Sequence, residues 1–346
     1  MPGWLAVSSA IAGRALILTA AVAVLLWVLT QLALPVLAFL VALPLVTLLE
    51  PVARILRRHG LPPAAAAAVT LIGALVALIG VFVALVVPVV DQFDNLREDL
   101  QAGVAALDET LSTLPGGLDI NLDELWAEAA SRVNENVEMI SAQLFSGARV
   151  AVEVVAGALL CLATTFFLLK DSDQITAWLT SRTPAGIRED VRAAGGRAWV
   201  TLASYVRGQM IVAAADAIGI GIGLLVIGVP LVLPLAALTF FGAFIPVVGA
   251  LLAGVAVVLI AFVDGGLTQA LLALAIVVVV QQLESNLLAP VVLGRTLPLH
   301  PLVVLLAVTA GAVIAGIIGA LIAVPVSAVI VAVLGEVRSR HGVTPA

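Results

Sequence analysis

The sequence predicts an all-α, polytopic helical membrane protein with about six to eight spanning helices. Of its 346 residues, 62% are hydrophobic and only 11% are charged, and the mean hydropathy is +1.22. Soluble globular domains have fewer apolar and more charged residues. Several apolar runs also reach the length of roughly 20 residues that a helix needs to cross a hydrocarbon core about 30 Å thick. Lipid is therefore the expected solvent, and no soluble catalytic domain is left over.

The predicted spans begin near the amino terminus. Arg14 precedes an apolar run that continues past Pro35 into a second one, whereas a cleavable signal peptide has a short apolar core followed by a cleavage site. We expect the first run to stay as an anchor. The runs that read as single helices are 16–34, 35–49, 64–87, 150–169, 211–229 and 267–280, and two longer runs cover 232–263 and 302–334.

Each of the two longer runs has more residues than one spanning helix needs but too few for two full ones. The first contains Pro234, Pro246 and Gly249, and the second contains Gly311, Gly316, Gly319 and Pro325. The sequence predicts that each run enters the membrane and comes back as a broken or re-entrant helical hairpin. Such breaks are tolerated only where they are buried in protein or line a watery cavity, as in transporter sites. The positions expected to serve as hinges or helix breaks are Pro246, Gly249, Pro290, Gly294, Gly316, Gly319 and Pro325.

Charge distribution predicts the orientation. Basic residues follow the second and fourth runs and end the chain, which makes these segments and both termini cytoplasmic by the positive-inside rule. The stretch 91–147 instead has twelve acidic residues against Arg97 and Arg132, so we expect it outside. The predicted parts are N-terminal helices (1–90), an extracytoplasmic insert (91–147), one span (148–169), a cytoplasmic amphipathic segment (170–204), a transport core with broken helices (205–335) and a cytoplasmic tail (336–346).

The insert has the pattern of an amphipathic helical hairpin. Apolar residues recur three and four apart on both sides of a Pro115-Gly116-Gly117 break. The two stripes could pack on each other, or one could pair with a neighbouring subunit as in a coiled coil. The second alternative predicts a homo-oligomer.

Polar residues at membrane depth are the candidate substrate or ion-binding residues, because charges are expensive in lipid. Asp216 lies inside an apolar helix, where it could bond to a neighbouring helix or hold a cation or proton. Glu284 ends another apolar helix and could bind a cation or a proton, whereas a salt bridge with Arg295 would make it a gate latch. His300 precedes Pro301 and could cap the last helix. The remaining candidates, all next to Glu284, are Gln281, Gln282, Ser285 and Asn286.

Other classes of site are not predicted. The sequence has no metal-ligand cluster, no nucleophile–base arrangement and no phosphate-binding loop, so we expect no enzyme activity, no cofactor and no metal. The net charge of −6 disfavours nucleic acid as a partner. Cys161 and the Gly219–Gly223 pair are interpreted mainly as helix packing, although the glycines could also form a hinge.

An ordered set of short motifs resembles the autoinducer-2 exporter family of permeases over nearly the whole chain. The resemblance implies a polytopic permease, since members are linked to export of autoinducer-2 and others to sodium–proton antiport, and it adds to the expectation of a homo-oligomer. Many relatives have an acid where this chain has Ala243. The motifs are Tyr205-Val206-Arg207-Gly208-Gln209, Phe244-Ile245-Pro246-Val247-Val248-Gly249, Gln281-Gln282-Leu283-Glu284-Ser285-Asn286, Pro290-Val291-Val292-Leu293-Gly294-Arg295, Leu299-His300-Pro301 and Ala323-Val324-Pro325.

The function expected from these observations is secondary transport. The protein would export a small polar solute or exchange cations for protons across the cytoplasmic membrane, with membrane lipid and the solute or ion as its partners. A passive channel is the alternative, and a structural or signalling membrane protein is a third. Two broken hairpins and a few buried acids favour transport, because a scaffold needs neither Asp216 nor Glu284.

Overall fold

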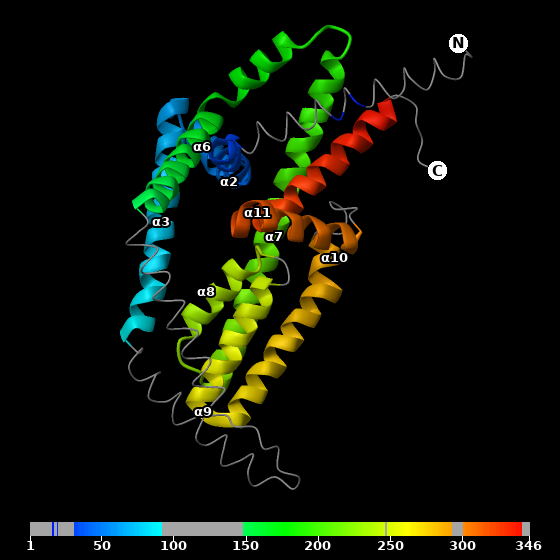
Figure 1. Ribbon diagram of the computed structural model, residues 1–346. Helices are drawn as coiled ribbons and strands as arrows, with labels where there is room; N and C mark the ends of the chain where they lie inside the picture. Colours follow the sequence, from blue (N-terminus) through cyan, green and yellow to red (C-terminus); the bar gives the residue numbers. More distant parts are fainter. Residues whose placement is uncertain are drawn as a thin grey trace, which may run out of the picture.

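The protein is an all-α membrane protein, as predicted. The computed structural model describes residues 31–91, 148–245, 248–292 and 300–340, together with Leu16 and Thr19. Within these ranges every regular element is helical, and six helices are long and apolar enough to cross a membrane. In Figure 1, α9 runs beside the lower part of α7, whereas α11 crosses α7 and α2 is seen end-on. Residues 92–147 of the insert, most of the first run, and Pro246, Gly294 and Arg295 lie outside the described residues.

Three helices form the N-terminal part. Helix α2 (Ala33–Arg58) packs against both α3 (Pro63–Asp91) and α6 (Ala148–Arg182), around a cluster that includes Val46, Ala67 and Leu169. Helix α2 contains Pro51 and continues to Arg58, so it runs past the predicted span 35–49. The prediction stopped at the last apolar residue, whereas a helix continues wherever residues keep helical dihedrals, including arginines at a membrane surface.

The membrane part of α6 ends at a break. Asp171 has non-helical dihedrals (φ −114°, ψ 20°), which separates the predicted span 150–169 from the segment that follows it. The Arg57 guanidinium at the end of α2 donates a hydrogen bond to the Leu169 carbonyl just before this break. The end of α2 is thereby fixed to the membrane exit of α6.

Helix α7 is the central element. It runs from Arg188 to Ile227, and its 40 residues rise about 60 Å, twice the thickness of a hydrocarbon core. Its first half therefore extends outside the lipid. The helix ends at Gly228, whose φ of 76° is the left-handed conformation that commonly terminates helices.

The run 232–263 forms the first predicted hairpin. Helix α8 (Val232–Gly242) has 11 residues and rises about 16 Å, half of a hydrocarbon core, so it re-enters rather than spans. The chain turns at 243–245, and α9 (Val248–Leu283) begins three residues later. The two limbs cross at Gly242 and Gly249, where a Cβ on either residue would lie less than 3 Å from the other's carbonyl oxygen. We call α8, the tip 243–245 and residues 248–264 the first hairpin.

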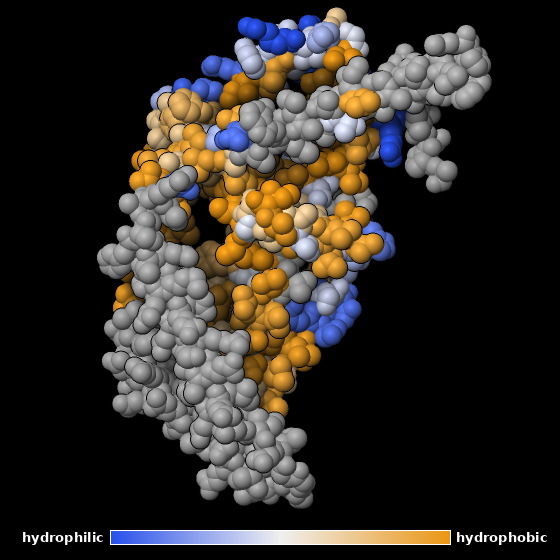
Figure 2. All heavy atoms as spheres, viewed as in Figure 1, coloured by the Kyte–Doolittle hydropathy of each residue, from blue (hydrophilic) through white to orange (hydrophobic). Residues whose placement is uncertain are grey.

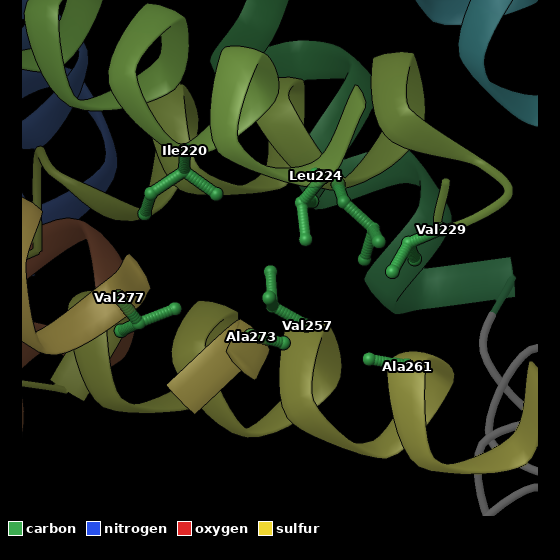
Figure 3. Close-up of a cluster of buried hydrophobic side chains, with 8 residues drawn as sticks. Ile220, Leu224, Val229, Val257, Ala261, Ala273 and Val277 are labelled. Atoms are coloured by element: carbon green, nitrogen blue, oxygen red, sulfur yellow. The ribbon is translucent and has the colours of Figure 1, made fainter. Parts of the chain in front are cut away.

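Helix α9 reverses direction at Gly265 and Gly266, the latter with φ 70°. We call residues 267–283 the returning limb. Ile220 and Leu224 of α7 pack between the two limbs of α9, against Val257 and Val277 (Figure 3). This apolar cluster holds the returning limb against α7.

The run 302–334 forms a second hairpin within α11 (Pro301–Arg340). The chain reverses at Ala315 and Gly316 (φ 60°), and Gly311 and Gly319 bring the two limbs into backbone contact. This hairpin packs on α7 and α2 through a cluster of Leu202, Tyr205, Val206 and Val324 with neighbouring apolar side chains. Both interrupted runs are therefore hairpins, as the sequence predicts.

The outer surface of the helices is apolar. Large side chains such as Phe82, Val226 and Ile314 are between 65% and 81% exposed. Figure 2 shows apolar side chains over the central and lower helices and hydrophilic ones at the upper end, over the α6–α7 connection. Apolar surface of this extent on separate helices is typical of contact with lipid rather than water.

Candidate functional site

Asp216 lies on the inner face of α7. Its side chain is 2% exposed, and its Oδ1 atom is buried with no hydrogen-bond donor among the described residues. Its neighbours along the helix face include Val212, Ala213 and Ile220, which are also buried. A charged carboxylate in such surroundings is costly unless it is protonated or paired with a positive charge, so the groups near Asp216 matter.

The partner is Glu284, 68 positions later in the chain. The returning limb of α9 passes directly into a π-helical segment, η1 (Glu284–Leu288), whose first residue is Glu284. The Glu284 carboxyl group lies close enough to the Asp216 carboxyl group for the two to interact electrostatically. Short π-helical segments occur frequently at functional sites because they redirect a side chain. The two acids that the sequence identifies separately therefore form one carboxyl pair.

Two glycines bring the helices close enough for this contact. The nearest side-chain atoms to a Cβ on Gly223 would be those of Ile276, and to a Cβ on Gly219 those of Val280. Asp216 lies one turn beyond Gly219, and Glu284 lies one turn beyond Val280. The antiparallel helices thus meet once per turn, at Gly223 and then at Gly219. One turn further, the facing residues are Asp216 and Glu284. The interpretation of Gly219 and Gly223 as packing residues agrees with these contacts.

The carboxyl pair needs a positive charge. Two unit charges 4 Å apart repel by about 4 kcal/mol at an effective dielectric constant of about 20. Within the described ranges, no salt bridge involves Asp216 or Glu284. A shared proton turns the contact into a hydrogen bond, and a bound monovalent cation neutralises it in another way. The site can therefore hold a proton or a cation.

The other polar candidates near Glu284 bond along their own helix. Asn286 Nδ2 donates to Gln282 Oε1 at 2.9 Å, and Ser285 Oγ donates to the Gln281 carbonyl at 2.5 Å. In the described part of the chain, no hydrogen bond joins these four side chains to the carboxyl pair. Gln282, Ser285 and Asn286 are exposed, and a hydrophilic patch covers the end of α9 in Figure 2. These side chains form a polar border next to the carboxyl pair, but they make no hydrogen bond to it among the described residues.

The remaining predicted residues are placed as follows. His300 is exposed, and its Nδ1 accepts a hydrogen bond from the Leu302 backbone N–H at 3.2 Å, which caps the start of α11. Pro290 lies in the short helix α10 (Ala289–Val292), and Pro325 is buried inside α11. Gly249, Gly316 and Gly319 lie at the hairpin crossings and turns described above. A hinge role for these residues stays a prediction.

Gln209 is a candidate that the sequence did not single out. Its Nε2 donates a hydrogen bond to the Ala243 carbonyl at the tip of the first hairpin, at 2.6 Å. It lies seven residues before Asp216 and thus on the same face of α7. That spacing is visible in the sequence, whereas the partner at the hairpin tip is not.

Comparison with known proteins identifies the family. A family model described as AI-2E family transporter matches residues 16–339. A candidate transport protein of Mycobacterium tuberculosis is 38% identical over 319 residues, which is 92% of this chain and 87% of the relative. Candidate transport proteins of Bacillus subtilis and Synechocystis are 34% and 30% identical, over 48% and 71% of this chain and 44% and 62% of their own lengths. The chain belongs to the AI-2E family of membrane transporters.

Proposed function

We propose that the protein is a secondary transporter of the cytoplasmic membrane that couples the movement of a small polar solute or a cation to protons at the Asp216–Glu284 pair. The observation that carries the proposal is the contact between these two carboxyl groups, one buried in α7 and one in η1. Family membership supports transport as the class of activity.

The carboxyl pair suits an exchange mechanism. With one proton between them the two groups attract each other, and without it they repel unless a cation enters. A proton and a cation therefore compete for one place, which is the requirement for antiport. Loss of the proton without a cation pushes η1 and the returning limb away from α7, so the occupancy of the pair can drive a conformational change.

The surroundings support access to the pair from water. Glu284 is only partly buried, and its neighbours Gln282, Ser285 and Asn286 are exposed polar side chains. Amide and hydroxyl groups at this border are suited to a hydroxylated solute such as autoinducer-2. We place both termini in the cytoplasm and infer a homo-oligomer, for which the charge pattern and the insert provide the argument.

Flux in proteoliposomes with a trapped pH-sensitive dye tests the proposal. Sodium ions and autoinducer-2 are added separately as probes, with and without an imposed proton gradient. We expect Asp216→Asn and Glu284→Gln to lower the proton-coupled flux at least about tenfold, the change that about 1.4 kcal/mol produces. Asp264→Asn is the matched control, because Asp264 is an exposed acid on the same helix as the returning limb.

Three results would contradict the proposal. The carboxyl pair is not the coupling site if both variants keep wild-type flux and pH dependence. Coupled transport is absent if neither probe moves protons. A passive channel is indicated if flux follows the solute gradient alone and is unaffected by an imposed proton gradient.

A further inference from the structure

The tip of the first hairpin is attached to α7 by one side chain. Ala243 follows the last residue of α8, so its carbonyl has no acceptor role within that helix. Gln209 Nε2 supplies the missing donor at 2.6 Å. Among the described residues, no other hydrogen bond joins the tip to α7. The link is therefore a single hydrogen bond between two elements that pack through apolar side chains.

The base of the same hairpin has the geometry of a hinge. The connection from α7 to α8 contains Gly228 with φ 76° and Leu231 with φ 56°. A positive φ is rare for a bulky residue such as leucine and stores strain at that position. The crossing of Gly242 and Gly249 fixes the two limbs to each other near the tip. The hairpin is therefore internally tight near its tip, while the link between its base and α7 contains two residues of positive φ.

The other side of the hairpin is loosely packed. An apolar cavity of about 790 Å³ separates α8 from α3 and is lined by Phe82, Leu238 and Phe241 among other residues. In Figure 1, α8 lies between α3 and α7. The hairpin is thus held by α7 on one side and has space, which lipid chains can fill, on the other.

The hydrogen bond at the hairpin tip and the carboxyl pair lie on the same face of α7. Gln209 and Asp216 share a helix face, and the rise between them is about 10 Å. Buried Val212 and Ala213 occupy the turn between them. Movement of the tip would free the Gln209 side chain, which lies two turns of α7 from Asp216.

We propose that Gln209 is a positioning residue that latches the first hairpin closed, and that release of its bond to the Ala243 carbonyl opens a path along α7 to the carboxyl pair. This inference rests on the proposed transport function, but the position of the hairpin can be measured without transport. Gln269 provides a matched control. Its Nε2 donates at 2.9 Å to the carbonyl of Ile227, the last residue of α7, so it makes the same kind of bond at the hairpin base.

The test measures the distance between α7 and the hairpin by double electron–electron resonance in the full-length protein in nanodiscs. Spin labels are placed at Ile211→Cys and Val248→Cys, which are 55% and 52% exposed, in a Cys161→Ser background that has no other cysteine. In Gln209→Met, which is similar in size but has no donor, the ratio of the longer to the shorter distance population should rise about fivefold. This ratio corresponds to about 1 kcal/mol, the net value of one hydrogen bond. Gln269→Met should leave the ratio unchanged.

A second variant tests the donor itself. Gln209→Glu has an O–H donor only when protonated, so its distances should match the unsubstituted protein at acid pH and Gln209→Met at alkaline pH. The latch is refuted if Gln209→Met keeps the unsubstituted distances, if Gln269→Met shifts them equally, or if Gln209→Glu shows no added dependence on pH. A shift in distance together with normal coupling in Glu284→Gln would support the latch and refute the proposed function. Unchanged distances in Gln209→Met together with lost coupling in Glu284→Gln would refute the latch but not the proposed function.

Discussion

Gly223 sets the distance between α7 and the returning limb, so Gly223→Ala should disturb the carboxyl pair from two turns away. A Cβ on Gly223 would lie 2.4 Å from Cγ2 of Ile276, whereas ordinary contacts begin at 3.4 Å. The difference means that the two helices must separate by about 1 Å. Ile276 cannot easily turn aside, because a β-branched side chain in a helix has one strongly preferred rotamer.

The cost of this separation can be estimated. Adding one methyl group to a packed interface typically costs about 1–3 kcal/mol. The same displacement moves Glu284 away from Asp216, since Gly223, Gly219 and the carboxyl pair belong to one antiparallel register. We therefore expect Gly223→Ala to lower both the thermal stability and the proton-coupled flux.

A double substitution separates packing from other causes. Ile276→Ala removes the Cγ2 atom that the new methyl group would meet, so the pair Gly223→Ala and Ile276→Ala should be more stable than the sum of the single effects predicts, by about 0.5–3 kcal/mol. Gly80→Ala in α3 is the control, because a Cβ there has nothing within 4 Å, and better helix propensity should make it neutral or slightly stabilising. Thermal unfolding in detergent and the proteoliposome flux are the measurements. An unchanged Gly223→Ala variant, or single effects that simply add, would refute the assigned contact.

Two further predictions concern the α2–α6 contact and the topology. Arg57→Met should lower the free energy of unfolding by about 1–3 kcal/mol, because it leaves the Leu169 carbonyl without its donor, whereas exposed Arg58→Met should have little effect; equal effects of the two variants would contradict the assignment. An engineered cysteine in the linker 112–121, in a Cys161→Ser background, should react with an impermeant reagent in intact cells, and a reaction seen only after lysis would reverse the orientation.

Most of the fold could be predicted from the sequence because lipid imposes simple requirements. A spanning helix needs a long apolar run, and a run that is too long and contains glycine and proline must turn back. The reversals near Pro246 and at Gly316 follow from these requirements. The helix ends do not, because arginine-containing segments such as the end of α2 and the start of α7 are as compatible with helix as with loop.

The candidate site could be predicted only in parts. Asp216 and Glu284 stand out as acids in apolar runs, but nothing near either residue shows that they meet. Their contact requires the reversal at Gly265–Gly266, the close approach at Gly219 and Gly223, and a π-helical segment at Glu284. Each depends on three-dimensional packing, so the sequence predicts two separate candidates where the structure has one pair.

The π-helical segment accounts for the different environments of Glu284 and its polar neighbours. In a regular α-helix, Glu284 would lie beside Gln281, one turn earlier, whereas the adjacent Ser285 would lie about 100° further around the helix. A π-helix has more residues per turn, so at η1 Glu284 faces α7 while Ser285 and Asn286 remain exposed. The carboxyl group proposed to hold a proton therefore has a different environment from the groups proposed to meet a solute. Under the proposed function, proton binding at the pair and solute binding at the polar border would be coupled through the position of η1, the short segment that carries both sets of groups.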